Sequence, residues 1–89
     1  MQHVVIQTTA GEAQVISIKD DPIKAINYAR EATMVFISDV MGDHTRDLPE
    51  SEWPPRPEPV ENFSTCDDGH YMFVIEVEEF DWMLTVHPV

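Results

Sequence analysis

The chain has little of what cross-linked, secreted or membrane-bound proteins require. It contains one cysteine, Cys66, in 89 residues, so it cannot form an internal disulfide bond. A secreted domain of this size usually needs such cross-links, and we therefore expect a reducing, cytoplasmic location. Residues 1–9 have no basic segment followed by a long apolar run, so we expect no secretory signal. Unbroken apolar runs, such as residues 34–37, are far too short to cross a membrane.

Glycine is scarce, and the motifs of the common enzyme classes are missing. The three glycines, Gly11, Gly42 and Gly69, are far apart, so there is no glycine-rich loop that could hold a phosphate. No serine lies in the G-x-S-x-G context of a hydrolase. Two aspartates follow Cys66, and their charges disfavour the thiolate that a cysteine nucleophile needs. We therefore expect no enzymatic activity, no catalytic residue and no cofactor.

The spacing of metal ligands is also lacking. The four histidines, His3, His44, His70 and His87, are scattered along the chain. Residues 66–70 contain Cys, Asp and His, but not the paired Cys or His spacing of a structural zinc site. Their Asp-Asp-Gly sequence lacks the alternating acidic positions of a calcium loop. The sequence therefore predicts no metal site.

Basic residues are few, and their scarcity dominates the electrostatics. Five Lys and Arg oppose 17 Asp and Glu, which gives a formal net charge of −12. Residues 1–30 are neutral in sum, and no Lys or Arg occurs from residue 57 onward. Such a field repels nucleic acid and anionic membranes and attracts basic surfaces. Solubility alone is the alternative explanation, although small soluble domains commonly carry about 2–8 net charges.

The elements that are present predict one α+β domain over residues 1–89, because a chain this short supports a single core. Asp21 followed by Pro22 predicts a helix start, and apolar residues at spacings of three and four predict an amphipathic helix that ends near Ala32. The predicted strands cover residues 4–9, 15–18, 33–40, 71–77 and 82–87. We expect an antiparallel sheet of about five strands with one helix on one face, in the order ββαβ, loop, ββ.

The connection at about 42–69 is predicted to be a long, acidic loop that holds five of the seven prolines. Loops of this length are uncommon in small domains and are often functional, and proline makes the backbone stiff. Trp53 within the loop either anchors it on the sheet, which we favour, or contacts a partner. The P-x-x-P pattern at 54–57 is interpreted as a rigid connector.

The acidic side chains are the strongest functional signal. Glu76 and Glu78 are two apart on a predicted strand, so we expect both to point to one face, about 7 Å apart. No residue of opposite charge lies nearby in sequence. Carboxylates held a few ångströms apart on a stiff framework resemble the charge pattern of a nucleic-acid backbone. The predicted partner-binding residues are Glu50, Glu52, Trp53, Glu58, Glu61, Glu76, Glu78, Glu79 and Asp81.

These features favour a non-enzymatic inhibitor that binds a basic protein, and we expect that protein to handle nucleic acid. In size and charge only, the chain resembles small phage and mobile-element proteins that block host nucleases or CRISPR effectors. Immunity proteins and antitoxins that cap a nuclease share the same character and form one alternative. The other alternative is a small adaptor subunit that pairs through an exposed strand edge. The sequence leaves the partner and the oligomeric state open.

Overall fold

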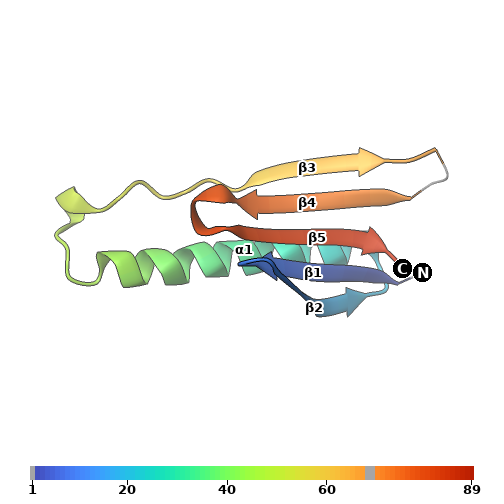
Figure 1. Ribbon diagram of the computed structural model, residues 1–89, viewed down its shortest axis with the longest axis horizontal. Helices are drawn as coiled ribbons and strands as arrows, with labels where there is room; N and C mark the ends of the chain where they lie inside the picture. The colour runs from blue at the N-terminus through green and yellow to red at the C-terminus, as the bar shows by residue number, and fades with distance from the viewer. Residues whose placement is uncertain (1, 68–69) are drawn as a thin grey trace.

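The computed structural model describes residues 2–67 and 70–89, and within them one long helix lies against a five-stranded antiparallel sheet (Figure 1). The strands follow the spatial order β2-β1-β5-β4-β3. The elements are β1 (His3–Thr9), β2 (Glu12–Lys19), α1 (Pro22–Thr45), η1 (Glu50–Glu52), β3 (Val60–Thr65), β4 (Tyr71–Val77), η2 (Glu78–Phe80) and β5 (Trp82–Pro88). The predicted α+β fold with one helix on one face is confirmed. Asp68 and Gly69, at the end of the predicted loop, lie outside the described residues.

The first hairpin forms as predicted. β1 and β2 pair antiparallel and are joined by Ala10 and Gly11, whose φ angles are 51° and 81°. Two positive φ angles in succession are typical of the tight turn that matches the twist of a hairpin. A shift in the pairing register at Val5 and Ile6 marks a bulge in β2. The bulge lets Ile16 reach the core beside the helix.

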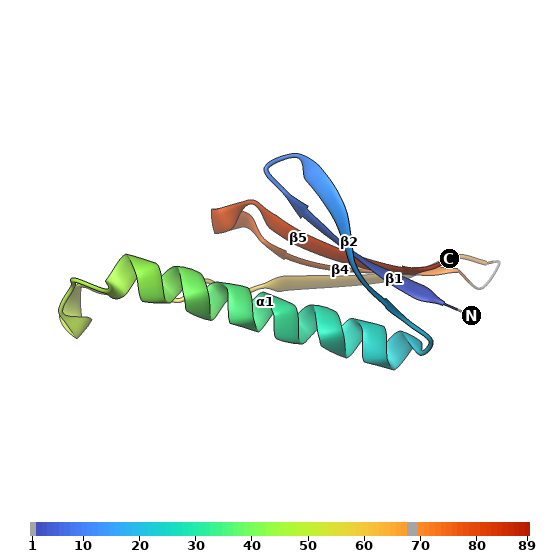
Figure 2. The ribbon, with the colours of Figure 1, turned by 90° about the horizontal axis from the view of Figure 1, so that it is seen from below.

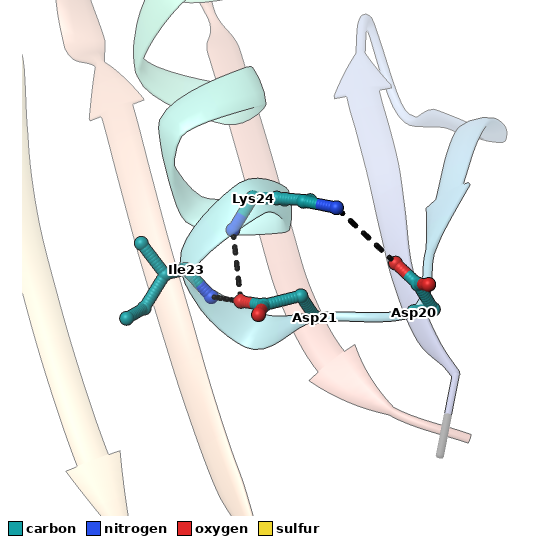
Figure 3. Close-up of polar contacts among 4 residues, drawn as sticks. All are labelled: Asp20, Asp21, Ile23 and Lys24. Carbon is teal, nitrogen blue, oxygen red and sulfur yellow. Dashed lines mark hydrogen bonds and ion pairs between the residues drawn. The ribbon is translucent and has the colours of Figure 1, made fainter.

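The start of α1 is also confirmed. Oδ1 of Asp21 accepts hydrogen bonds from the backbone N–H groups of Ile23 at 2.8 Å and Lys24 at 3.3 Å (Figure 3). Pro22 occupies the first helical position, where its missing N–H costs nothing. These bonds satisfy donors that the first turn of a helix leaves without partners.

The predicted strand at 33–40 is wrong, because α1 continues through these residues to Thr45. Their β-branched and aromatic side chains favour a strand locally. The buried positions nevertheless recur every four residues, at Ala25, Ala29, Thr33 and Ile37, which is the spacing of one helical face. Burying this stripe against the sheet outweighs the local preference for a strand.

The fifth strand comes from the predicted loop instead. β3 covers residues 60–65 and forms one edge of the sheet beside β4. All of its residues are exposed. The element order is therefore ββα, loop, βββ, and the irregular connection is confined to residues 46–59 around η1.

The core lies between α1 and one face of the sheet (Figure 2). The sheet contributes seven buried residues to this core: Val5, Phe73, Ile75, Val77, Trp82, Leu84 and Val86. Phe36 of α1 stacks on Trp82 with ring centroids 4.0 Å apart. The indole Nε1 of Trp82 donates to the hydroxyl of Thr33 at 3.3 Å, and that hydroxyl donates to the carbonyl of Ala29 at 2.9 Å. These contacts hold the end of the β4–β5 hairpin against the middle of the helix.

The helix is longer than the sheet that it covers. Twenty-four helical residues extend about 36 Å, whereas a seven-residue strand extends roughly 23 Å. Ile37 is the last buried residue of α1, and the turns after it project beyond the sheet (Figures 1 and 2). The molecule therefore measures 51 × 24 × 21 Å. Within the described residues, no helix is both long and apolar enough to span a membrane.

Candidate protein-binding site at the acidic end

The projecting end of the molecule gathers three segments, of which two are consecutive in sequence and the third lies about 20 residues further along the chain. These are the last turns of α1, the connection that follows it, and the η2 turn between β4 and β5 (Figure 1). We call residues 39–58 and 78–81 the acidic end. They contain nine carboxylates and only two arginines. The nine carboxylates, all exposed, belong to Asp39, Asp43, Asp47, Glu50, Glu52, Glu58, Glu78, Glu79 and Asp81.

The segment after the helix is held by its own hydrogen bonds. The backbone N–H of Leu48 donates to the carbonyl of Thr45 at 3.1 Å, which continues the helical turn. In η1, the N–H of Glu52 donates to Pro49 at 2.9 Å and that of Trp53 donates to Glu50 at 3.2 Å. Prolines on either side restrict the remaining backbone. The carboxylates of Glu50 and Glu52 are thus carried on an ordered framework.

Trp53 is hydrogen-bonded within its own connection, whereas the favoured prediction anchored it on the sheet. Its indole Nε1 donates to the carbonyl of Leu48 at 3.0 Å, within the same connection. The side chain stays 48% exposed. The tryptophan therefore stabilises the connection locally and leaves a large part of its ring open to solvent at the acidic end.

Arg56 ties the proline-rich segment back to the helix. Its Nη2 donates to the hydroxyl of Ser38 at 3.1 Å. The segment consequently runs beside the projecting turns of α1 instead of extending away from them. Arg46, the other arginine of this end, pairs with Asp43 at 3.0 Å, one helical turn away.

A pocket of ≈ 430 Å³ opens where the three segments meet. Its apolar part comes from Met41, Phe80 and three prolines, and its charged rim includes Glu58 and Glu79. Its lining residues are Met41, His44, Pro54, Pro55, Arg56, Pro57, Glu58, Glu79 and Phe80. Arg56 also lines this pocket, but the two carboxylates outnumber it. An apolar floor beside them can accept a basic side chain, because its methylene groups contact the floor while its charged head meets the carboxylates.

The aromatic side of this pocket is fixed by stacking. The ring of Phe80 meets Phe36 edge to face at a centroid distance of 5.9 Å and lies 5.7 Å from the ring of His44. Asp81 follows with φ 52° and ψ 42°, and its N–H donates to the carbonyl of Glu78 at 3.2 Å. Aspartate tolerates this left-handed conformation better than most residues, so the tight reversal keeps Glu78 and Glu79 on a short, rigid turn.

Seven of the nine predicted binding residues lie at the acidic end. Glu58 and Glu79, which are 21 positions apart in sequence, line the same pocket. The others at this end are Glu50, Glu52, Trp53, Glu78 and Asp81. The structure thus brings together carboxylates from the connection and from the β4–β5 turn, although these form two separate groups along the sequence.

Glu76 and Glu61 lie elsewhere. Glu76 is on β4, whereas Glu78 begins the 3-10 turn after the strand ends at Val77, so the two carboxylates do not share a strand, contrary to the prediction. Oε1 of Glu61 accepts from Nη2 and Nε of Arg30 at 2.7 and 3.0 Å. The positive charge of Arg30 on α1 therefore lies beside this carboxylate. The residues next to Glu61 in the sequence give no indication of this pairing.

Sequence reasoning missed the carboxylates that α1 brings to this end. Asp39 and Asp43 are four residues apart, so they share one helical face, and Asp47 follows the helix end. These three aspartates could have been assigned to this end if the helix had been predicted to continue to residue 45. The position of Asp47 is electrostatically unfavourable, because the C-terminal end of a helix carries partial negative charge. Asp43 is compensated by its ion pair with Arg46.

Cys66 lies apart from this site. It is exposed in the connection between β3 and β4, and its backbone N–H donates to the carbonyl of His70 at 2.7 Å. In the part of the chain that the structure describes, no three His, Cys, Asp or Glu side chains are grouped so that they could hold a metal ion.

A comparison of the chain with protein families, curated proteins and solved structures found no match.

Proposed function

We propose that the protein is a non-enzymatic inhibitor that inserts its acidic end into a basic, nucleic-acid-binding site of a larger cytoplasmic protein. The observation that carries the proposal is the gathering of nine exposed carboxylates at the acidic end, two of which, Glu58 and Glu79, line one pocket. Sites that bind phosphate backbones are rich in Lys and Arg. A dense group of carboxylates on an ordered support offers such a site the charge that it normally receives from nucleic acid.

The placement of the charge supports a binding role over a purely solubilising one. Carboxylates that serve solubility are best mixed with basic residues over the whole surface. Here nine of the 17 carboxylates lie at one end, and one of them, Asp47, follows the C-terminal end of α1, where the helix dipole disfavours negative charge. A charge arrangement that costs stability is expected where it provides binding energy or fast association.

The pocket supplies the apolar contact that charge alone lacks. We propose that one Lys or Arg of the partner enters it between Glu58 and Glu79 and contacts the ring of Phe80. Exposed Trp53 adds a second aromatic contact at the same end. Charge then directs the encounter, and these aromatic side chains contribute to affinity. A phage or mobile-element protein that disarms a host nuclease or CRISPR effector would have this character.

The test compares two double charge reversals of equal size. Glu58→Lys with Glu79→Lys changes the pocket rim, whereas Asp20→Lys with Asp67→Lys changes two exposed carboxylates outside the acidic end. Each protein is immobilised, incubated with a lysate of the source organism at low salt, and eluted with rising NaCl. We expect the original protein and the Asp20/Asp67 variant to retain basic nucleic-acid-binding proteins and to release them as salt rises.

The Glu58/Glu79 variant should lose this retention by about tenfold or more, since each 1.4 kcal/mol of lost attraction is a factor of ten. Retention by both variants alike would contradict the proposed site. Capture of no basic protein by any of the three would contradict the proposed function.

A further inference from the structure

The face of the sheet opposite α1 is not covered by any helix of the described chain (Figure 2). Residues that pair directly across antiparallel strands share one face. The pairs Ile6 with Val15, Ile6 with Thr85, and Val74 with Thr85 therefore place these side chains together. We call the side of the sheet that contains them the open face.

The open face is apolar, although it is exposed. Its strand residues include Val15 at 53%, Ile18 at 54%, Val60 at 52% and Met72 at 46% exposure. A sheet that is apolar on both faces is normally covered on both, because each face gains free energy when it leaves water. The accessible surface of the chain is 6038 Å², whereas a compact monomer of 10.2 kDa is expected to expose about 5,300 Å².

The charge on this face limits its possible occupants. Among the described strand residues that the pairing places on the open face, Glu76 is the one carboxylate. The rest of this acidic protein, and the acidic end above all, would repel a second copy. The open face is thus the surface through which two copies can approach without bringing many like charges together.

The area of the open face is close to the lower limit for a specific pair. Five strands about 4.8 Å apart and roughly 23 Å long present a flat area of about 550 Å². Two such faces together would bury about 1,100 Å², slightly above the roughly 1,000 Å² that a specific interface requires.

We infer that the open face binds the same face of a second copy, with the strands of the two sheets reversed. Reversal places the two acidic ends at opposite ends of the dimer. At physiological salt their repulsion is then small, because charges are screened within about 8 Å. Glu76 and His87 lie towards opposite ends of the open face. In the reversed orientation, Glu76 of one copy therefore lies towards His87 of the other copy. In a parallel orientation, the two Glu76 carboxylates would come together.

Sedimentation equilibrium on the full chain tests this inference with a matched pair of variants. Met72 on the open face and Met34 on α1 are 46% and 45% exposed. We expect twice the chain mass of 10.2 kDa for the original protein and for Met34→Glu. Met72→Glu should be monomeric, because its carboxylate would face Glu76 of the other copy. Val15→Glu and Val35→Glu, at 53% and 60% exposure in the original side chains, form a second pair.

Circular dichroism establishes that each variant retains the helix. A monomer at all concentrations of the original protein would overturn the inference and leave the face for a different partner. A dimer unaffected by both Met72→Glu and Val15→Glu would overturn the assignment of the face. Small-angle X-ray scattering tests the orientation, since reversed copies must exceed the 51 Å length of one copy and parallel copies must not. The open face and the acidic end are separate surfaces, so this outcome is independent of partner capture by the Glu58/Glu79 variant.

Discussion

At the residue scale, the hydroxyl of Thr33 joins the helix to the sheet. The side chain is fully buried, and the hydroxyl accepts from the indole of Trp82 at 3.3 Å while donating to Ala29. Thr33→Val keeps the shape but leaves the indole N–H without its partner. We expect a loss of about 1–3 kcal/mol in the free energy of unfolding, measured by urea denaturation. Thr45→Val is the matched control, because that hydroxyl bonds only to the carbonyl of Met41 within the helix. Equal losses in the two variants would contradict this role for Thr33.

The second residue-scale feature is the contact between Tyr71 and His3. The hydroxyl of Tyr71 lies 2.8 Å from Nδ1 of His3, a residue that is only 5% exposed. Burial, and secondarily the charge of Asp21, raise the pKa of Tyr71 above its ordinary value of 10.0. A raised pKa means that the folded protein favours the neutral phenol. The contribution of the neutral phenol to the free energy of unfolding is fully present below pH 10 and is lost as the pH rises through the pKa of Tyr71 in the folded protein.

Tyr71→Phe tests this contact in two ways. At neutral pH the variant should be less stable by about 1 kcal/mol, because the ring nitrogen of His3 loses a partner. Above pH 10 the difference in unfolding free energy between the original protein and the variant should shrink. A constant difference across the alkaline range would show that the phenol does not report this environment.

At the element scale, α1 ends among carboxylates that its dipole disfavours. Asp47 follows the C-terminal cap, Arg46, and is exposed. Asp47→Asn should raise the free energy of unfolding by about 0.3–1 kcal/mol, because it removes negative charge from the helix C-terminus. Asp67→Asn, an exposed change outside any helix, should change stability less. Urea denaturation of both variants measures the difference. A destabilised Asp47→Asn variant would contradict the electrostatic account of this helix end.

The elements that were predicted correctly are those that local chemistry determines. The hairpin and the helix start depend on local chemistry, such as the side chain of Asp21 and the turn at Ala10 and Gly11, and both were predicted correctly. The helix end was not. Residues 33–37 are locally β-favouring, and only the four-residue spacing of buried positions, set by packing on the sheet, makes them helical. β3 was missed because its pairing with β4 is not visible in its own composition.

The candidate site depends on the same tertiary packing. The sequence predicted Glu58 and Glu79 as binding residues, but not that the two lie together. Their meeting around one pocket requires that α1 reach residue 45 and that η2 lie against it through Phe36 and Phe80. In the same way, the proximity of Arg30 to Glu61 joins α1 to β3. No pattern along the chain encodes either contact.

At the scale of the whole molecule, two surfaces of opposite character lie on one elongated body. The radius of gyration is 14.9 Å, against about 12 Å expected for a compact chain of this length. Salt should act on the two surfaces in opposite directions. Binding of a basic partner to the acidic end should weaken as salt rises, whereas association of two copies should strengthen because their mutual repulsion is screened. Sedimentation and binding measured over one salt series check both signs, and equal signs would contradict the separation of the two surfaces.

We propose that the acidic end occupies a site where the partner otherwise holds nucleic acid. The direct measurement is fluorescence anisotropy of a labelled DNA or RNA bound to the captured basic protein, titrated with this protein. We predict that the original protein and the Asp20/Asp67 variant release the labelled strand, and that the Glu58/Glu79 variant needs about tenfold more protein to do so. Binding of this protein with the labelled strand still in place would contradict the proposed competition for that site.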